Sequence, residues 1–213
     1  MTMRLYYSPL ACSLATHIAC REVGLEPELV RVDLRSKQKA TGGDLFGENP
    51  MGQVPTLILD DGRTLTENVA VLSYLEDRAG AQKSKADAAP SDRYEVMRWL
   101  SFVSSEIHKR VLWPIYGGAP DAVKSYAREA AKRPLDVVAA HLASRDTLVD
   151  PSFTVADAYL FWALTILPHA GVSLDPWPAL ARYHALHKAR PAVHAAFAFE
   201  KKEYEKPFVG AVS

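Results

Sequence analysis

Apolar and polar positions follow two different periods along the chain. Short apolar runs, bounded by Gly-, Pro- and Asp-containing turns, predict β-strands at residues 4–7, 28–33, 56–59 and 64–65. Helical spacing over residues 13–23, ending at Gly24, predicts a helix between the first two strands. A strand, a helix and a strand within about 30 residues form a βαβ unit, so we expect these two strands to be parallel.

The second half of the chain has helical spacing and no strand pattern. A helix over residues 67–78 closes the first part, after a polar stretch at 34–49 with room for a short helix. Further helices are predicted at 93–111, 120–143, 154–167, 177–188 and 191–204. Pro134 should kink or split the second of these, and the third is apolar enough to be buried nearly all round. We expect a mixed-sheet domain at 1–80, a linker at 81–89 and an all-helical domain at 90–213.

Composition and charge exclude several classes of protein. Hydrophobic residues make up 48% of the chain and charged residues 23%, as in ordinary globular proteins. Twenty-five basic and 25 acidic side chains cancel, which argues against a nucleic-acid surface. No run approaches the roughly 18 apolar residues of a membrane span, and we expect no signal peptide. Cys12 and Cys20 lie about 12 Å apart if they share one helix, too far for a disulfide, which favours a reducing, cytoplasmic compartment.

Three local features point to a site for a small sulfur-containing peptide. Pro55 cannot donate to a central β-ladder, so it should turn the chain and leave the backbone of Val54 free to pair with a peptide-like ligand. Glu67 and Asn68 open a helix, where free N–H groups and the positive dipole end suit a carboxylate. Cys12 follows a Ser-Pro turn at another helix start, an environment that favours a thiolate.

Five motifs in this order resemble the glutathione S-transferases, most of all the bacterial beta class. They are Ala11-Cys12-Ser13-Leu14-Ala15-x-His17, Asn49-Pro50-x-Gly52-Gln53-Val54-Pro55, Leu65-Thr66-Glu67, Glu106-x-His108-Lys109 and Phe153-Thr154-Val155-Ala156-Asp157-Ala158-Tyr159-Leu160. The resemblance covers nearly the whole chain. It implies an α/β plus all-α fold, in which a thioredoxin-like domain (βαβ-α-ββα) precedes a helical bundle. It also implies a homodimer that uses glutathione as co-substrate to attack soft hydrophobic electrophiles.

The resemblance gives catalytic roles to three residues. Cys12 corresponds to a cysteine that contacts the glutathione sulfur or forms a mixed disulfide with it. Tyr7 corresponds to the beta-class tyrosine. Because Tyr6 and Tyr7 point to opposite faces of a strand, at most one of them faces the sulfur. His108 faces the cysteine in the family.

Further positions are implied as binding residues. The backbone of Val54 would pair with the cysteinyl part of glutathione, and its neighbours Gln53 and Pro55 are also implied as substrate-binding. Glu67 would bind the ammonium group and Asn68, where the family usually has Ser, the γ-glutamyl carboxylate. Lys37 matches a residue on the glycyl carboxylate. Ser101, Ser105 and Glu106 match positions that reach the neighbouring subunit's glutathione. Lys109 is the last residue of the Glu106-x-His108-Lys109 motif and is also implied as a binding residue. An electrophile pocket between the domains would be walled by Leu10, Trp113, Pro114 and Tyr116.

Two other functions remain open beside conjugation. Cys12 lacks the second cysteine of a C-x-x-C pair, so disulfide reduction would need a monothiol route through a glutathione mixed disulfide. The chain could also be a non-catalytic carrier of apolar ligands. The histidines show no metal-ligand spacing, Thr154-x-x-Asp157 is a helix cap and no catalytic pair, and residues 206–210 could fold over the cleft or stay loose.

Overall fold

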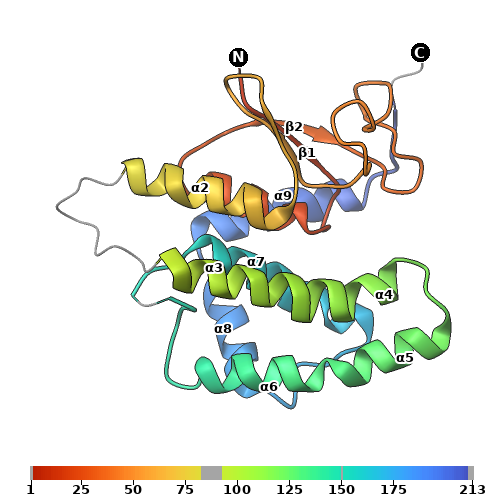
Figure 1. The fold of residues 1–213 in the computed structure, drawn as a ribbon. Coiled ribbons are helices and arrows are strands. Elements are labelled where there is room, and N and C mark those ends of the chain that lie inside the picture. The colour runs from red at the N-terminus through yellow and green to blue at the C-terminus, as the bar shows by residue number, and fades with distance from the viewer. Residues whose placement is uncertain (1, 83–92, 150, 211–213) are drawn as a thin grey trace. The chain divides into compact units, whose positions relative to one another are not determined.

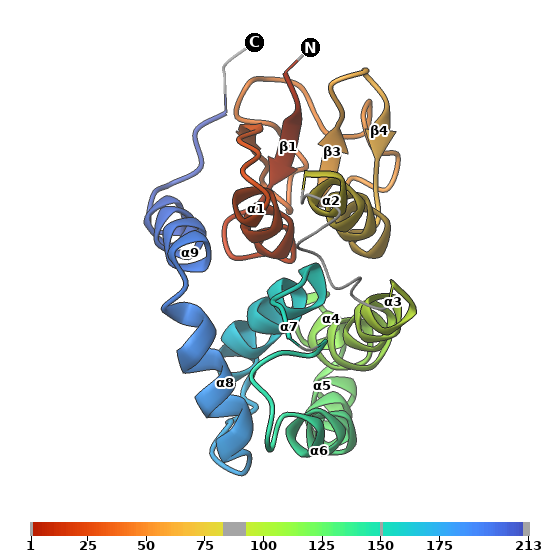
Figure 2. The ribbon, with the colours of Figure 1, turned by 90° about the vertical axis from the view of Figure 1, so that its left-hand side faces the viewer.

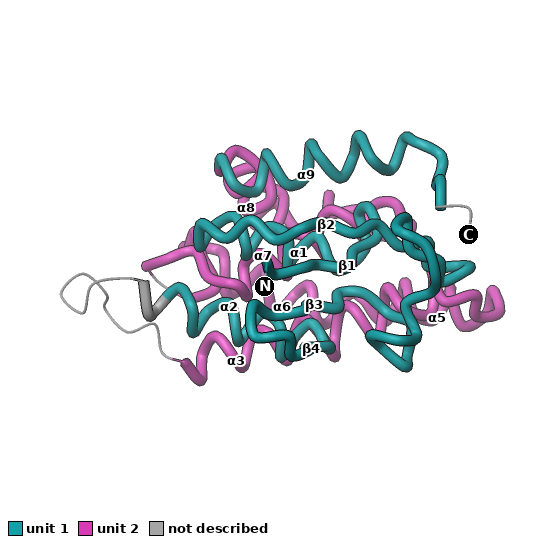
Figure 3. Tube along the Cα trace, turned by 90° about the horizontal axis from the view of Figure 1, so that it is seen from above, with its two compact units in different colours: residues 1–82, 191–213 teal, residues 83–190 magenta. Residues whose placement is uncertain are grey.

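The chain forms two compact units, which are coloured separately in Figure 3. A computed structural model describes residues 2–82, 93–149 and 151–210. Residues 1–82 and 191–213 make the first unit and residues 83–190 the second. Most of the expected linker, residues 83–89, lies outside the described residues. The last predicted helix belongs with the N-terminal unit, whereas the sequence pattern had placed it among the other helices.

A four-stranded mixed sheet forms the centre of the first unit. Its strands are β1 (Arg4–Tyr7), β2 (Glu28–Arg31), β3 (Thr56–Ile58) and β4 (Thr64–Leu65), in the order β2-β1-β3-β4. β1 and β2 are parallel, as the βαβ pattern predicts, and the other two pairs are antiparallel. Gly62 closes the predicted hairpin turn between β3 and β4 by donating its N–H to the Leu59 carbonyl.

Three helices belong to this unit and begin and end close to their predicted bounds. They are α1 (Ser13–Glu22), α2 (Asn68–Gln82) and α9 (Pro191–Tyr204). Figure 2 shows α1 between α9 on one side and α2 on the other, and α1 packs against both. Helix α1 thereby meets two segments that are far from it in the sequence.

Successive residues of β1 face different surroundings, as strand alternation requires. Tyr6 packs in a buried cluster with Val30, Val32, Leu45 and Val54. The following residue, Tyr7, lies on the other side, beside rings from α1 and α9. The sheet therefore separates a core made with loop residues from a core made with helices.

The stretch at residues 34–49 contains no helix, although the sequence left room for one. It forms turns and two isolated antiparallel bridges, Val32–Lys39 and Gln38–Asp44. The carboxylate of Asp33 accepts the backbone N–H groups of Arg35 and Ser36. Such a local bond offers the backbone an alternative to helical hydrogen bonding, which explains why the loop stays irregular.

The second unit is helical. α3 (Arg93–Phe102) continues into a π-helical segment, η1 (Val103–Leu112), and α4 (Trp113–Tyr116), so the expected helix at 93–111 is longer and not uniformly α-helical. The expected helix at 120–143 is split at Ala131 into α5 (Asp121–Ala130) and α6 (Lys132–His141). Pro134 lies in the first turn of α6, where its missing N–H costs nothing. Figure 1 shows these elements together with α7 (Val155–Ile166), η2 (Pro168–Ala170) and α8 (Pro178–Lys188).

Helix α7 is buried along most of its length and carries the predicted cap. Residues 155–164 are all buried, and Thr154 and Asp157 form a capping box. The buried Asp157 carboxylate accepts four hydrogen bonds, from the Leu148 and Thr154 N–H groups and from the hydroxyls of Thr154 and Tyr183. Within the described parts of the chain, no helix is both long and apolar enough to cross a membrane.

Candidate functional site

The structure brings Cys12 and the Val54 turn into direct contact. Ser13 accepts the Ser8 N–H through its hydroxyl at 3.2 Å and donates back to the Ser8 carbonyl, which shapes the turn before α1. The half-buried Cys12 thiol then donates to the Val54 carbonyl, with an Sγ–O distance of 3.1 Å. The sequence had predicted free backbone groups at Val54. Because a carbonyl oxygen has two lone pairs, it can still accept a second hydrogen bond from a peptide.

Asn68 joins the start of α2 to the start of α1. Its Nδ2 donates to the Cys12 carbonyl at 3.1 Å, and its Oδ1 accepts the Thr16 hydroxyl at 3.2 Å. The side chain is buried and is used within the protein. We therefore expect any contribution of this helix start to a bound carboxylate to come through backbone N–H groups.

The turn at Gln53, Val54 and Pro55 is braced from within. Asn49 donates to the Gln53 carbonyl at 2.9 Å and to the Thr56 hydroxyl at 3.1 Å, and that hydroxyl also donates to the Gln53 carbonyl. The Val54–Pro55 peptide bond is cis. These bonds hold the backbone of Val54 in one orientation, as a template for a peptide ligand requires.

Backbone strain marks three of the predicted site residues independently of any motif. Within residues 2–82, 93–149 and 151–210, the non-glycine residues with left-handed φ are Leu10 at 61°, Lys37 at 65° and Glu67 at 65°. All three are predicted site residues. A left-handed φ costs a side-chain-bearing residue about 1–3 kcal/mol, and such strain concentrates at functional sites. Glu67 also lies directly before α2, and its carbonyl accepts the Val71 N–H.

The side chain of Lys37 lies over Gly52, directly before the Val54 turn. A methyl group built on Gly52 would approach Lys37 Cδ to 3.2 Å and Phe46 Cε1 to 2.8 Å. Any larger residue at position 52 would push these side chains away, and the left-handed φ of Gly52, 57°, disfavours it further. Lys37, Gln53 and Val54 thus share one neighbourhood of the first unit.

Glu200 supports the loop before Cys12 and had no sequence signal. Its carboxylate, on α9, accepts the Leu10 N–H at 2.8 Å and lies 2.9 Å from His17 Nδ1. Burial raises the pKa of this carboxyl, and the hydrogen bond with His17 opposes that rise. Glu200 is 190 residues from Leu10 in the chain. No local pattern could have paired them.

Tyr7 occupies a packed environment. It is 2% exposed, and its ring centroid lies 6.5 Å from that of His17 and 6.2 Å from that of Phe199. Burial raises the pKa of the Tyr7 phenol, and the carboxylates of Glu203 and Glu200 raise it further. Tyr7 is therefore a neutral phenol at physiological pH, and its catalytic role stays a prediction. Cys20 is fully buried, with a thiol pKa raised to about 12, as expected for a core residue.

In the second unit, His108 lies in an aromatic box on the π-helical segment. Its Nδ1 is 2.7 Å from the Tyr159 hydroxyl, and its ring centroid is 4.7 Å from that of Trp162. Burial, with a smaller contribution from the nearby charge of Lys109, lowers the pKa of His108 to about 3. The imidazole is thus neutral near pH 7 and can act as a hydrogen-bonding group but not as a cation. Tyr159 was not foreseen as its partner.

This pKa makes a prediction about acid stability. Below pH 6.5 an unfolded histidine takes up a proton that folded His108 refuses until about pH 3. The unfolded state therefore binds more protons in this window, and stability falls as pH falls. Between pH 7.5 and pH 4.5 the wild type should lose about 2–3 kcal/mol more than His108→Asn, measured by urea unfolding. Parallel losses in the two proteins would show that His108 does not titrate in this way.

The remaining predicted residues lie on α3, η1 and α4. Glu106 accepts hydrogen bonds from Ser105 and Arg110, at 3.1 and 2.9 Å. The Lys109 ammonium lies 4.4 Å from the ring centroid of Trp113. Ser101, Trp113 and Tyr116 are exposed. These residues belong to the second unit, whereas Cys12, Lys37, Val54, Glu67 and Asn68 belong to the first.

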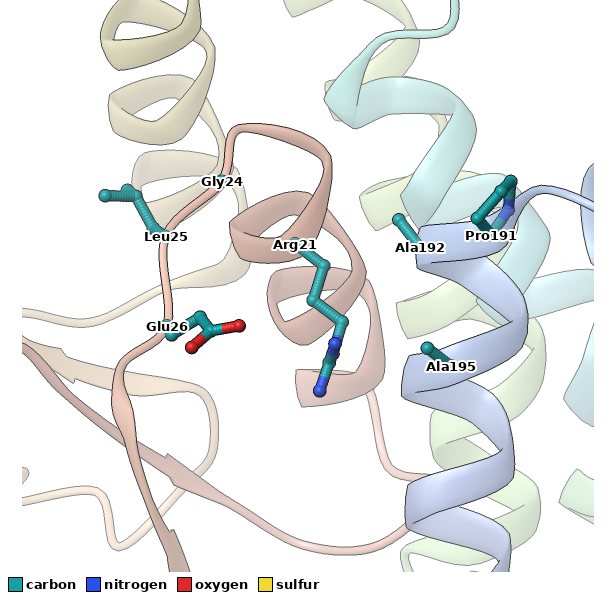
Figure 4. A pocket seen from close by; sticks show the side chains of 7 residues that line it. All are labelled: Arg21, Gly24, Leu25, Glu26, Pro191, Ala192 and Ala195. Carbon is teal, nitrogen blue, oxygen red and sulfur yellow. The ribbon is translucent and has the colours of Figure 1, made fainter.

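A groove elsewhere in the first unit contains none of the predicted residues. Figure 4 shows its lining: Arg21, Gly24, Leu25, Glu26, Pro191, Ala192 and Ala195. Arg21 donates to His17 Nε2 at 3.3 Å. In the part of the chain that the structure describes, no cluster of three or more His, Cys, Asp or Glu could hold a metal ion.

Known proteins are similar to this sequence over almost its full length. Residues 11–78 match the glutathione S-transferase N-terminal domain, and residues 66–191 match the glutathione S-transferase C-terminal domain. Glutathione S-transferase GstA of Escherichia coli O157:H7 is 36% identical over 198 residues, which cover 93% of this chain and 98% of that protein.

Solved structures agree with the sequence match. A sphingomonad glutathione S-transferase complexed with glutathione superposes with a TM-score of 0.84 at 40% identity, over 93% of this chain and 98% of that one. The bacterial beta class glutathione S-transferase of Sphingomonas chungbukensis gives a TM-score of 0.84 at 40% identity, over 92% and 98%. These likenesses confirm the predicted fold class, a thioredoxin-like domain followed by a helical domain. The chain therefore belongs to the glutathione S-transferase family and is most like its bacterial beta class.

Proposed function

We propose that this protein transfers the thiol of reduced glutathione to soft, hydrophobic electrophiles. The observation that carries the proposal is the contact between the Cys12 thiol and the Val54 carbonyl. The Cys12 sulfur and the backbone of the Val54 turn therefore lie together beside the start of α2. The N–H groups at a helix start suit a carboxylate. A tripeptide with a central thiol and a carboxylate at each end matches this arrangement.

Each part of glutathione has a proposed partner. The backbone of Val54 pairs with the cysteinyl residue, as an added strand does. Glu67 binds the ammonium group, the N–H groups at the start of α2 bind the γ-glutamyl carboxylate, and Lys37 binds the glycyl carboxylate. Cys12 lies against the glutathione sulfur. These contacts orient the tripeptide before any bond forms.

The chemistry is a substitution or addition at carbon. The glutathione thiol loses its proton, the resulting thiolate forms an S–C bond, and a leaving group departs with its electron pair when the electrophile carries one. Neutral hydrogen-bond donors near the sulfur stabilise the thiolate and so promote this step. We propose His108 and Tyr7 for this support, and the exposed Trp113 and Tyr116 for contact with the electrophile.

Two further proposals accompany the activity. The protein acts as a homodimer in which Ser101, Ser105 and Glu106 contact the neighbouring subunit's glutathione. It works in the cytoplasm, because Cys12 and Cys20 are not joined in a disulfide and its co-substrate is the reduced form of glutathione. Light scattering at nanomolar concentration tests the dimer, and a monomer would contradict it.

The decisive experiment measures conjugation of glutathione to an electrophilic aryl halide. The purified protein should raise the rate clearly above the uncatalysed reaction, in proportion to enzyme concentration. Reaction at the uncatalysed rate would remove the proposed transferase function and favour the carrier or the redox alternative.

Glu67 provides a sharper test of the binding site. Replacing Glu67 with alanine removes the carboxylate that pairs with the ammonium group, a charge-assisted bond worth about 1–2 kcal/mol. The KM for glutathione should rise about 5- to 30-fold with little change in kcat. The exposed carboxylate of Glu26, outside the predicted site, is the matched control. An unchanged KM in Glu67→Ala would disprove this role.

A second candidate function uses the cysteine itself. The Cys12 thiol, which is in no disulfide, could attack a disulfide of glutathione, forming a Cys12–glutathione mixed disulfide and releasing a thiol. A second glutathione would then attack the mixed disulfide, release oxidised glutathione and restore Cys12. This monothiol route needs Cys12, whereas conjugation does not form a bond to it.

A further inference from the structure

The end of the chain is tied across the sheet edge by one arginine. Residues 205–210, which follow α9 and are here called the C-terminal strap, run beside the loop that follows β2 (Figure 1). Arg31 of β2 donates to the Lys206 carbonyl at 3.0 Å and to the Pro207 carbonyl at 3.5 Å. Its guanidinium carbon also lies 5.6 Å from the ring centroid of Phe208. Phe208 is the one bulky apolar side chain of the strap that is partly buried.

The Arg31 side chain is partly buried, although its hydrogen bonds to the strap carbonyls are exposed. The Arg31 side chain is 17% exposed and the Glu203 side chain, 4.0 Å away at the end of α9, is 20% exposed. Glu203 also pairs with Lys206 at 2.5 Å. Reduced solvent screening strengthens such bonds, and Arg can serve two carbonyls at once because of its planar fork.

The same arginine holds the loop that carries Lys37. The Arg31 carbonyl accepts the Ala40 N–H at 2.8 Å, and the neighbouring Val32 forms an antiparallel bridge with Lys39. The far end of the strap reaches this segment directly, since a methyl group built on Gly210 would lie 3.9 Å from the Lys39 carbonyl oxygen. The strap therefore lies against the loop two residues from Lys37.

Lys37 needs such support because its backbone is strained. Its φ of 65° persists only when surrounding contacts determine it. The Lys37 carbonyl accepts the Leu45 N–H at 2.9 Å, and its own N–H donates to the Asp33 carbonyl at 2.7 Å. These two hydrogen bonds lie within the loop and are not part of a helix or a continuous strand. Contacts of the loop with the C-terminal strap therefore matter for its shape.

We propose that the C-terminal strap, anchored by Arg31, is a positioning element that holds the Lys37 loop in the form that binds the glycyl carboxylate of glutathione. This inference rests on the proposed function, because it assigns the strap to one end of the same ligand. It makes residues at the very end of the chain contributors to substrate affinity although they touch no substrate.

The test compares glutathione with γ-glutamylcysteine, which lacks the glycyl residue. Truncation after Glu205, and separately Arg31→Ala, should raise the KM for glutathione about five-fold or more with kcat nearly unchanged. The KM for γ-glutamylcysteine should change little, because that substrate lacks the glycyl carboxylate that Lys37 is proposed to bind and its own C-terminal carboxylate ends one residue short of that position. Truncation after Gly210 keeps the strap, and Arg63→Ala removes an exposed arginine at the opposite edge of the sheet; both should behave as wild type.

A second readout does not depend on catalysis. Hydrogen exchange of the ligand-free protein should be faster at the Ala40 and Leu45 amides in both strap variants and unchanged in the two controls. If the wild type fails to use glutathione, the proposed function fails, and this exchange measurement still decides whether the strap holds the loop. Equal KM changes for both thiols, or unchanged exchange at these amides, would overturn the inference. Should the truncated chain fail to fold, Arg31→Ala and Phe208→Ala carry the same comparison.

Discussion

Replacing Cys12 with alanine should lower glutathione-dependent disulfide reduction by about 100-fold or more, while conjugation stays within about ten-fold of wild type. The monothiol route forms a covalent bond to Cys12 Sγ, so nothing in the variant can replace it. Conjugation uses the sulfur of glutathione, and in the proposed site Cys12 only lies against that sulfur while it donates to the Val54 carbonyl. Both activities are measured on the same preparations, with an aryl halide and a mixed glutathione disulfide.

Cys20→Ala is the matched control, because Cys20 is a buried thiol outside the site. It should keep both activities, apart from a modest loss of stability. Equal loss of conjugation and reduction in Cys12→Ala would show that Cys12 is needed to bind or ionise glutathione. Full retention of disulfide reduction would exclude the monothiol route.

Replacing Asp157 with alanine should lower the free energy of unfolding by about 3–5 kcal/mol. Its carboxylate, fully buried at the start of α7, accepts two N–H groups and two hydroxyl groups. The substitution leaves these four donors without their acceptor inside the protein. Burial raises the pKa of Asp157 and the four hydrogen bonds lower it, which gives a value of about 6. The carboxylate is therefore ionised at pH 7.5.

Urea unfolding at pH 7.5 measures this loss. Asp121→Ala is the control, because Asp121 also begins a helix but its side chain is 98% exposed, so its removal should matter little. If Asp157→Ala does not fold, Asp157→Asn retains one oxygen acceptor and should unfold at an intermediate urea concentration. A loss no greater than that of Asp121→Ala would mean that the capping box adds little to the stability of the helical unit.

Local patterns were enough to predict most elements. The bounds of β1, α1 and α9 and the split near Pro134 depend on side-chain period, turn residues and the missing N–H of proline, all within a few residues. The Thr154–Asp157 cap is confirmed for the same reason. Local patterns did not decide the loop at residues 34–49, where a short helix was possible. The Arg35 and Ser36 N–H groups donate to the Asp33 carboxylate, which favours a turn over a helix.

The site was predictable in its residue types and not in its contacts. Cys12, Val54 and Asn68 stood out in the sequence because a helix start and a proline turn are local features. Only the folded chain shows that the Cys12 thiol donates to the Val54 carbonyl. It also shows that the Asn68 side chain is hydrogen-bonded to α1 and its preceding residue. The Tyr159 partner of His108 likewise comes from a helix 51 residues away.

By itself the sequence determined the two kinds of domain, the family and the residues with chemistry, since these are carried by periodicity and short motifs. Only the tertiary structure decided that α9 packs on α1, that Glu200 supports the Leu10 loop and that the strap is tied to Arg31. An apolar helix face or a single charged residue shows that a partner is needed. Which partner it meets depends on how distant segments pack together, and no local pattern records that.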